Sequence, residues 1–231
     1  MSEAAGRPTP APGPAGAAPA PGPAGAAPGP APDPDSGLSA AELIERFAAL
    51  PVANVGDAMD RLNVVDSAIQ SVWPGPGARL AGRAVPVTVA GGDNQGIHEV
   101  IPTLSARDVL VVNGQGATHR ALIGELIAGR AMARGCAGFV LDACVRDAVD
   151  LQQMGFPVFA RGTTPAGPYR NGPFQAGVAA AVGSVVVHPG DLVLGDDDGV
   201  AIVPWGRAAQ VLATAEAKHA TEAQQRAEIG F

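Results

Sequence analysis

Short aliphatic runs alternate with a helical period in the middle of the chain. Residues 108–113, 139–142 and 156–160 are almost entirely apolar, which is typical of strands buried on both faces. Between the first two runs, apolar residues recur at close to the 3.6-residue period of a helix, at Leu122, Leu126, Ile127, Ala131 and Met132. Gly135 would stop this helix, and another short helix is expected to begin near Asp147. The resulting βαβαβ order predicts an α/β fold with a mixed or parallel sheet flanked by helices.

Helices and short strands are also predicted on both sides of this central unit. Ser39 is a suitable N-cap for an amphipathic helix that Pro51 would stop. Towards the other end, short apolar runs finish in a hairpin whose turn is carried by residues 197–199. A polar, alanine-rich helix over about 206–227 closes the chain.

The beginning of the sequence has a different composition from the rest. It consists almost entirely of proline, alanine and glycine. Such residues bury little area and cannot offset the entropy of ordering. We therefore expect residues 1–37 to form a disordered tail with polyproline II character. Residues 38–231 are expected to fold as a single domain.

Charge and composition exclude several classes of function. The formal net charge is −7, and the basic residues are scattered, with Lys218 as the only lysine. Nucleic-acid binding usually needs a clustered cationic face, so we expect none. No apolar run is long enough to cross a membrane. Cys136 and Cys144 form neither a CxxC pair nor a zinc pattern, so a reduced, cytoplasmic protein is expected.

The adjacent charges Arg146 and Asp147 are the first candidate for chemistry. They follow directly after a predicted buried strand, and ligand crevices of α/β folds form at the carboxyl ends of strands. A guanidinium can clamp a carboxylate, and an aspartate can bind a cation such as magnesium that keeps most of its waters. Taken alone, the pair is equally compatible with a surface ion pair at the start of a helix.

The glycine-rich stretch GQGATHRALIGEL, residues 114–126, is the second candidate, and it leads into the central helix. Backbone amides approaching a helix N-terminus favour a bound carboxylate. The stretch has neither the GK[ST] of a P-loop nor the GxGxxG of dinucleotide sites, so nucleotide binding is not expected. Glu125 lies in this element and, taken alone, would be a solvated helix acid.

The spacing of these residues changes the interpretation. Glu125, twenty further residues and then Arg146–Asp147 resemble the (D/E)-X20-R-D signature of the RraA-like family. Further similar segments lie in family order along the chain, namely VGDAMDRL, GDN, DVLVVNGQG, RALIGELIAGRAMARGCAGFVLDACVRD, FPVFARGTTP and GDLVLGDDDGVAIVP. Together they span nearly all of residues 52–204.

The resemblance implies an RraA-like swivelling β/β/α-type fold and a choice of functions. The family contains class II pyruvate aldolases that act on 4-hydroxy-4-methyl-2-oxoglutarate and 4-carboxy-4-hydroxy-2-oxoadipate. Such an enzyme is a metal-dependent lyase that releases pyruvate, and oxaloacetate decarboxylation passes through the same enolate. The family also contains regulators of RNase E, so a non-catalytic, protein-binding regulator is an alternative. A pathway enzyme with the same chemistry on a changed substrate is another.

By the same resemblance, each site residue has an implied role. Asp147 would hold the divalent metal, Mg²⁺ or Mn²⁺, and Arg146 would contact the pyruvate carboxylate or keto oxygen. Glu125 would position water at the metal. Backbone amides would cradle the substrate carboxylate, those of Leu122, Ile123, Gly124, Glu125 and Leu126. A homotrimer or homohexamer is also implied. Independently, the only lysine, Lys218, lies in the polar C-terminal helix, so a Schiff-base mechanism has no good candidate.

Several residues depart from the family pattern or leave two interpretations open. Ala143 stands where the family commonly has glycine, and its methyl group could shift the loop that carries Arg146. Asn113 replaces a frequent aspartate. His119 could touch substrate or simply bond to the backbone, and Arg161 could line the site entrance or form a salt bridge at an interface. Asp196, Asp197 and Asp198 are interpreted as turn formers, not as a metal cluster.

Overall fold

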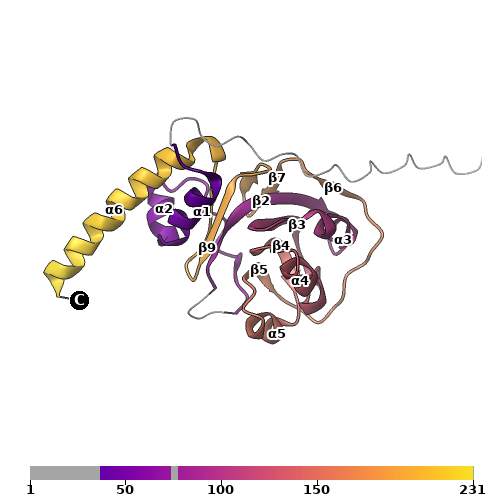
Figure 1. Cartoon of the computed structure of the whole chain (residues 1–231). Coiled ribbons are helices and arrows are strands. Elements are labelled where there is room, and N and C mark those ends of the chain that lie inside the picture. Colours follow the sequence, from indigo (N-terminus) through magenta and orange to yellow (C-terminus); the bar gives the residue numbers. More distant parts are fainter. Residues whose placement is uncertain (1–36, 74–77, 231) are drawn as a thin grey trace, which may run out of the picture.

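A computed structural model describes residues 37–73 and 78–230 of the chain (Figure 1). The predicted tail therefore lies outside the described residues, apart from Gly37. The helices are α1 (Ala40–Ala48), α2 (Val52–Ala58), α3 (Gln95–Val100), α4 (Glu125–Met132), α5 (Ala148–Gln153) and α6 (Ala208–Ile229). The strands are β1 (Gln70–Ser71), β2 (Leu80–Val89), β3 (Asp108–Ala121), β4 (Gly138–Val145), β5 (Val158–Thr163), β6 (Phe174–Ala176), β7 (Ala180–Val182), β8 (Val185–Val187), β9 (Leu192–Asp196) and β10 (Gly199–Val203). No described helix is long and apolar enough to cross a membrane.

The main sheet is mixed, as predicted. Its strands lie in the order β1-β5-β4-β3-β2-β9-β10, and β6 pairs with β2. The four central strands β2, β3, β4 and β5 run parallel, whereas β1, β6, β9 and β10 pair antiparallel with their neighbours. Parallel neighbours require crossovers, and α4 and α5 supply them after β3 and β4. The expected βαβαβ unit is therefore confirmed.

Both faces of the central strands are buried. On β3, Leu110 and Val112 pack into one core with α3, α4 and α5, while Val109 and Val111 pack into a second core on the opposite face. Every residue of β4 is buried. The β7–β8 hairpin covers the second core, and α4 and α5 lie on the other side of the sheet (Figure 1). Burial on both faces explains why these strands are continuous apolar runs in the sequence.

The remaining helices pack at the β9–β10 end of the sheet. Ser39 caps α1 in a full capping box with Glu42, as its position in the sequence predicts. Only the first part of α6 is buried, and the helix then extends away from the body (Figure 1). Lys218 on α6 pairs with Asp57 of α2 and with Glu222. The single lysine is thus a helix-to-helix contact at this end of the sheet.

The segment after Asn113 differs from the prediction. It is not a loop leading into a helix, because β3 continues to Ala121 through two irregularities in its pairing with β4. Positive φ angles at Gln115 and Gly116 accompany this irregular stretch. The helix then begins at Glu125, so Leu122, predicted to be helical, lies in the connection before it. Strand pairing with β4, a contact distant in sequence, overrides the local glycine signal.

A buried ion cluster joins β4, β5 and the loop before β1. Arg161 donates from Nε to Asp142, and its terminal nitrogens lie 3.4 Å from Asp66 Oδ2. The other Asp142 oxygen accepts the backbone N–H of Gly183 at 3.1 Å. The hydrogen bond to Asp142 raises the pKa of Arg161. Arg161 therefore forms salt bridges within the chain and, through Asp142, ties the sheet to the β7–β8 hairpin.

We expect Arg161→Ala to lower the free energy of unfolding by about 3 kcal/mol, because it leaves the buried Asp142 carboxylate without its counter-ion. Arg61→Ala is the matched control. Arg61 pairs with Asp57 at 3.3 Å but its side chain is 79% exposed, so its loss costs at most about 1 kcal/mol. Denaturant unfolding of both variants measures the difference, and equal effects would contradict a structural role for the cluster.

Candidate functional site

The site is built where the chain leaves β3 and β4. The Leu122 N–H donates to the Cys144 carbonyl at 2.9 Å, and the Arg146 N–H donates to the Ile123 carbonyl at 3.0 Å. These two bonds continue the pairing of β3 and β4 beyond the regular strands. They bring the start of α4 and the Arg146–Asp147 pair together at the carboxyl edge of the sheet, where α/β folds form ligand crevices.

Asp147 adopts a left-handed conformation with φ 58° and ψ 39°. Aspartate tolerates this region better than most residues, and such conformations occur often at functional sites. Its side chain makes no cap on its own helix α5. Instead, Oδ2 accepts the Glu125 N–H at 3.2 Å and lies 3.5 Å from Arg146 Nε. The carboxylate is thus held against the N-terminus of α4, where the helix dipole favours a negative charge.

Gly124 makes this close approach possible. A Cβ built on Gly124 would overlap Asp147 Oδ2 and would lie 3.0 Å from Arg146 Cγ and 3.1 Å from Arg146 Nε. The backbone of Gly124 is extended, with φ −149° and ψ −166°, so its requirement is one of space and not of conformation. The glycine is needed because two charged side chains lie directly against its backbone.

Part of the predicted amide cradle is available to a ligand. The N–H groups of Leu122 and Glu125 are already used, by Cys144 and Asp147. Those of Ile123, Gly124 and Leu126 have no hydrogen-bond partner among the described residues. Unpaired amides at a helix start are good donors to an anion. Of the five residues predicted to form the amide cradle, two therefore use their N–H groups for bonds within the protein. The other three leave their N–H groups free to bind a ligand.

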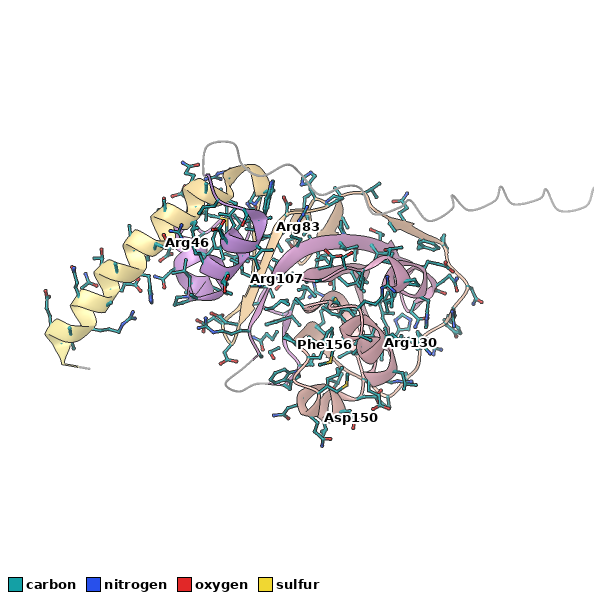
Figure 2. The ribbon with its side chains drawn as sticks, viewed as in Figure 1. Arg46, Arg83, Arg107, Arg130, Asp150 and Phe156 are labelled. Carbon is teal, nitrogen blue, oxygen red and sulfur yellow. The ribbon has the colours of Figure 1, made fainter. Side chains whose placement is uncertain are left out.

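These groups line a pocket of about 260 Å³. Its walls are formed by Asn94, His98, Ala121, Leu122, Ile123, Gly124, Leu126, Ile127, Arg130, Arg146, Asp147, Pro168 and Arg170. A second hollow, of about 490 Å³, adjoins it, and Arg146 and Asp147 line both. Figure 2 shows Arg130 and Asp150, which line the first and second hollow respectively, on the same side of the body. A pocket of about 260 Å³ can hold a small molecule.

Sequence reasoning missed part of this lining. His98 was not among the candidate residues, and Asn94 entered only through the GDN motif. Arg130 and Arg170 received no role at all. Asn94 is buried, donates from Nδ2 to the Leu122 carbonyl at 3.0 Å, and leaves its buried Oδ1 without a partner among the described residues. Burial, with added repulsion from Arg170 and Arg130, lowers the pKa of His98 and keeps its imidazole neutral at pH 7.

Glu125 occupies a different position from the other predicted site residues. Its backbone N–H holds Asp147, but its side chain is exposed and is not part of the pocket wall. The carboxylate has no hydrogen-bond or ion-pair partner among the described residues. Its predicted role in positioning water stays a prediction.

The departures from the family pattern are absorbed locally. Ala143 is fully buried, and a Cβ added to Gly114 would lie only 2.7 Å from the Ala143 methyl group. A glycine on β3 thus makes room for the alanine on β4. Asn113 accepts the Gln115 N–H at 2.9 Å, which supports the irregular part of β3.

Two other candidates lie away from the pocket. His119 is exposed and lies beside Gly92, outside the pocket wall. Asp196 accepts the N–H groups of Asp198 and Val52, so the acidic run does form a turn. The described residues contain no group of three acidic, histidine or cysteine side chains that could hold a metal.

The donor chemistry around Asp147 nevertheless fits a hard divalent cation. Oδ2 is engaged by Glu125 and Arg146, while Oδ1 has no partner among the described residues, and Asp147 lines both hollows. Magnesium is commonly bound by one or two carboxylates, with waters and substrate oxygens filling the remaining positions. A single carboxylate with a free oxygen beside a pocket meets this requirement.

Comparison with known proteins decides the family. The family model for RraA-like proteins, described as Aldolase/RraA, matches residues 52–202. The chain belongs to the RraA-like family. It is 36% identical over 193 residues to a protein of Halalkalibacterium halodurans named "Putative 4-hydroxy-4-methyl-2-oxoglutarate aldolase", covering 82% of this chain and 91% of that one.

Solved structures of the RraA-like family share the fold. The RNA-processing inhibitor RraA of Thermus thermophilus is 30% identical and superposes with a TM-score of 0.61, over 67% of this chain and 92% of that chain. Streptomyces coelicolor RraAS2, an unusual member of the RNase ES inhibitor RraA protein family, gives a TM-score of 0.73 at 24% identity, over 83% of this chain and 100% of that chain. The expected fold is thereby confirmed.

We expect Gly124→Ala to displace the Asp147 carboxylate and to lower the free energy of unfolding by about 1–3 kcal/mol, because the added methyl overlaps a held side chain. Gly129→Ala, on the same helix, is the control. Its Cβ would meet only Met154 Cε at an ordinary 3.7 Å, and alanine favours a helix. Unfolding curves and crystal structures of both variants test this, and an undisturbed Asp147 in Gly124→Ala would contradict it.

Proposed function

We propose that this RraA-like protein is a divalent-metal-dependent lyase. It cleaves a 4-hydroxy-2-oxo diacid of the 4-hydroxy-4-methyl-2-oxoglutarate type to pyruvate and a second keto acid. Decarboxylation of oxaloacetate, through the same pyruvate enolate, is a side activity. The single observation that carries the proposal is the convergence of Arg146, Asp147 and the unpaired amides around the start of α4 on one small pocket.

The amides bind and orient the 2-oxo acid. The unpaired N–H groups of Ile123, Gly124 and Leu126 receive the substrate carboxylate, and the dipole of α4 favours its charge. Asn94 supports this loop by holding the Leu122 carbonyl. The reacting carbons are thereby positioned beside Arg146 and Asp147, and holding reactants in place removes much of the entropic barrier.

Arg146 stabilises the charge that develops as the carbon–carbon bond breaks. The electrons of the C3–C4 bond move onto C3 and are delocalised onto the 2-oxo oxygen as an enolate, while the 4-hydroxyl loses its proton. A guanidinium donating to that oxygen binds the enolate more tightly than the ground-state ketone, and this difference accelerates the reaction. Asp147 would hold the divalent metal, which supplies Lewis-acid stabilisation of the same charge when bound.

Glu125 is assigned to the water that exchanges protons with the substrate. Its carboxylate is free and exposed at the start of α4. Water held there takes the proton of the 4-hydroxyl, and C3 of the enolate is then protonated to give pyruvate. A lysine-based route has no residue to use, since Lys218 is paired with Asp57 and Glu222 between α2 and α6.

The proposal includes a homotrimer or homohexamer. Large apolar side chains beside the site are exposed in the single chain, with Leu126 at 68% and Val149 at 65%. Exposed apolar side chains of this kind favour coverage by another subunit. Sedimentation of the purified protein gives the size of the assembly, and a monomer would refute this part of the proposal.

A protein-binding regulator of a ribonuclease is the second candidate. The names of the two RraA structures and the net charge of −7 favour it. An experiment can distinguish the two functions, because a protein-binding regulator does not need a metal at Asp147. Inhibition of a ribonuclease that survives Asp147→Ala, with no pyruvate release by the unaltered protein, would favour the regulator.

We expect Asp147→Ala to reduce pyruvate release from 4-hydroxy-4-methyl-2-oxoglutarate by at least about a hundredfold, because the metal loses its carboxylate. EDTA should have the same effect on the unaltered protein, and added Mg²⁺ or Mn²⁺ should reverse it. Asp197→Ala, in the exposed turn between β9 and β10, is the control and should retain activity. Full activity of Asp147→Ala would contradict the assignment.

A further inference from the structure

The pocket carries more positive charge than the proposed reaction centre needs. Its wall contains three guanidinium groups, those of Arg130, Arg146 and Arg170, and one carboxylate, that of Asp147. This lining belongs to a chain whose net charge is −7. The excess is therefore local, and a local excess of cations in a small pocket selects an anionic ligand.

Arg130 and Arg170 have no protein partner to neutralise them. Neither guanidinium forms an ion pair or a hydrogen bond with any described residue. Arg146 differs, because its Nε lies beside Asp147. Both unpaired arginines act on His98 in the same pocket, where they help to keep the imidazole neutral. The two guanidinium groups therefore lie around one space and not on unrelated surfaces.

The position of Arg130 matches the length of a diacid. Leu126 and Arg130 are four residues apart on α4, so they lie on one face and about 6 Å apart along the helix axis. Both line the pocket, and Leu126 carries one of the unpaired amides. Four carbon–carbon bonds of about 1.5 Å in a zigzag chain span roughly 5 Å. A five-carbon acid whose first carboxylate lies on the amides can thus bring its last carbon to the level of Arg130.

Arg170 is held in place by the backbone on both sides of it. The Tyr169 N–H donates to the Gly92 carbonyl at 2.8 Å, and the Tyr169 carbonyl accepts the Asn94 N–H at 3.0 Å. On the other side, the Asn171 N–H donates to Asp93, a buried carboxylate, at 2.6 Å. The loop that carries Arg170 is therefore pinned to the turn before α3. The backbone position of Arg170 beside the pocket is thereby fixed, which removes the entropic cost of ordering this loop when a ligand binds.

We propose that Arg130 and Arg170 together bind the distal carboxylate of the substrate and make the site selective for 2-oxo acids with a second anionic group. This inference rests on the proposed function and deepens it. The amides and Arg146 hold the reacting end of the molecule. The two unpaired guanidinium groups hold the far end and supply the charge-assisted hydrogen bonds that a neutral group cannot form.

The test compares two substrates of equal length that differ only at the far end. These are 4-hydroxy-2-oxoglutarate, with a distal carboxylate, and 4-hydroxy-2-oxopentanoate, with a methyl group in its place. The metal-loaded protein should prefer the diacid by about tenfold or more in kcat/KM. Arg130→Ala and Arg170→Ala should each lose about tenfold for the diacid, chiefly through KM, and should leave the monoacid unchanged. Arg130→Lys should recover part of the loss, since lysine restores the positive charge but not the planar pair of N–H donors that a guanidinium offers to a carboxylate.

A binding measurement separates this inference from the proposed function. The control variant is Arg207→Ala, whose exposed arginine lies outside the pocket. Calorimetry with 2-oxoglutarate and 2-oxobutanoate gives affinities that need no turnover. If no pyruvate is released but the diacid binds more tightly and Arg130→Ala removes the difference, the lyase proposal fails and the anion site stands. If the unaltered protein binds or cleaves both acids equally, or if both variants affect them alike, the distal carboxylate site is refuted.

Discussion

The site depends on the backbone pairing that continues past the regular ends of β3 and β4. The bonds from Leu122 to Cys144 and from Arg146 to Ile123 hold two connections together that are distant in sequence. Only in this arrangement can the Asp147 carboxylate reach the first amide of α4 across Gly124. The sheet below is buried on both faces, so the edge that carries these connections cannot shift without repacking two cores. The geometry of the proposed reacting groups is therefore a consequence of strand packing.

The charges around the pocket follow a simple order from one end to the other. The unpaired amides at the start of α4 and Arg146 lie at the end where we propose that the reaction occurs, with Asp147 as the single negative group of the wall and the proposed ligand of a cation. The unpaired guanidinium groups lie one helical turn away and across a pinned loop. His98 lines the same pocket, and its burial, together with Arg170 and Arg130, lowers its pKa. An elongated anion with its reactive centre near one end is the ligand that this order suits best.

Sequence reasoning succeeded where local pattern and burial agree. The continuous aliphatic runs gave the parallel strands, and the Ser39 capping signal gave the start of α1. The spacing from Glu125 to Arg146–Asp147 pointed to residues that the folded chain does bring together at the carboxyl edge of the sheet. Sequence reasoning failed after Asn113, where glycines and polar residues indicated a loop but pairing with β4 extended the strand. It also missed His98, Arg130 and Arg170, because single polar residues carry no signal until distant segments are folded against one another.

By itself, the sequence determined the element order and the α/β class, which follow from the periodicity of apolar residues along the chain. The resemblance of its spaced motifs indicated the family and supplied the candidate residues of the proposed reaction centre. Tertiary structure decided which amides remain unpaired, that Arg161 serves the sheet, and which side chains complete the pocket. The physical reason is that hydrogen-bond satisfaction and charge pairing depend on distance in space. The sequence does not show the partners of Arg130 or Arg161, and only the folded chain places Asp142 and Asp66 beside Arg161 while Arg130 stays unpaired among the described residues.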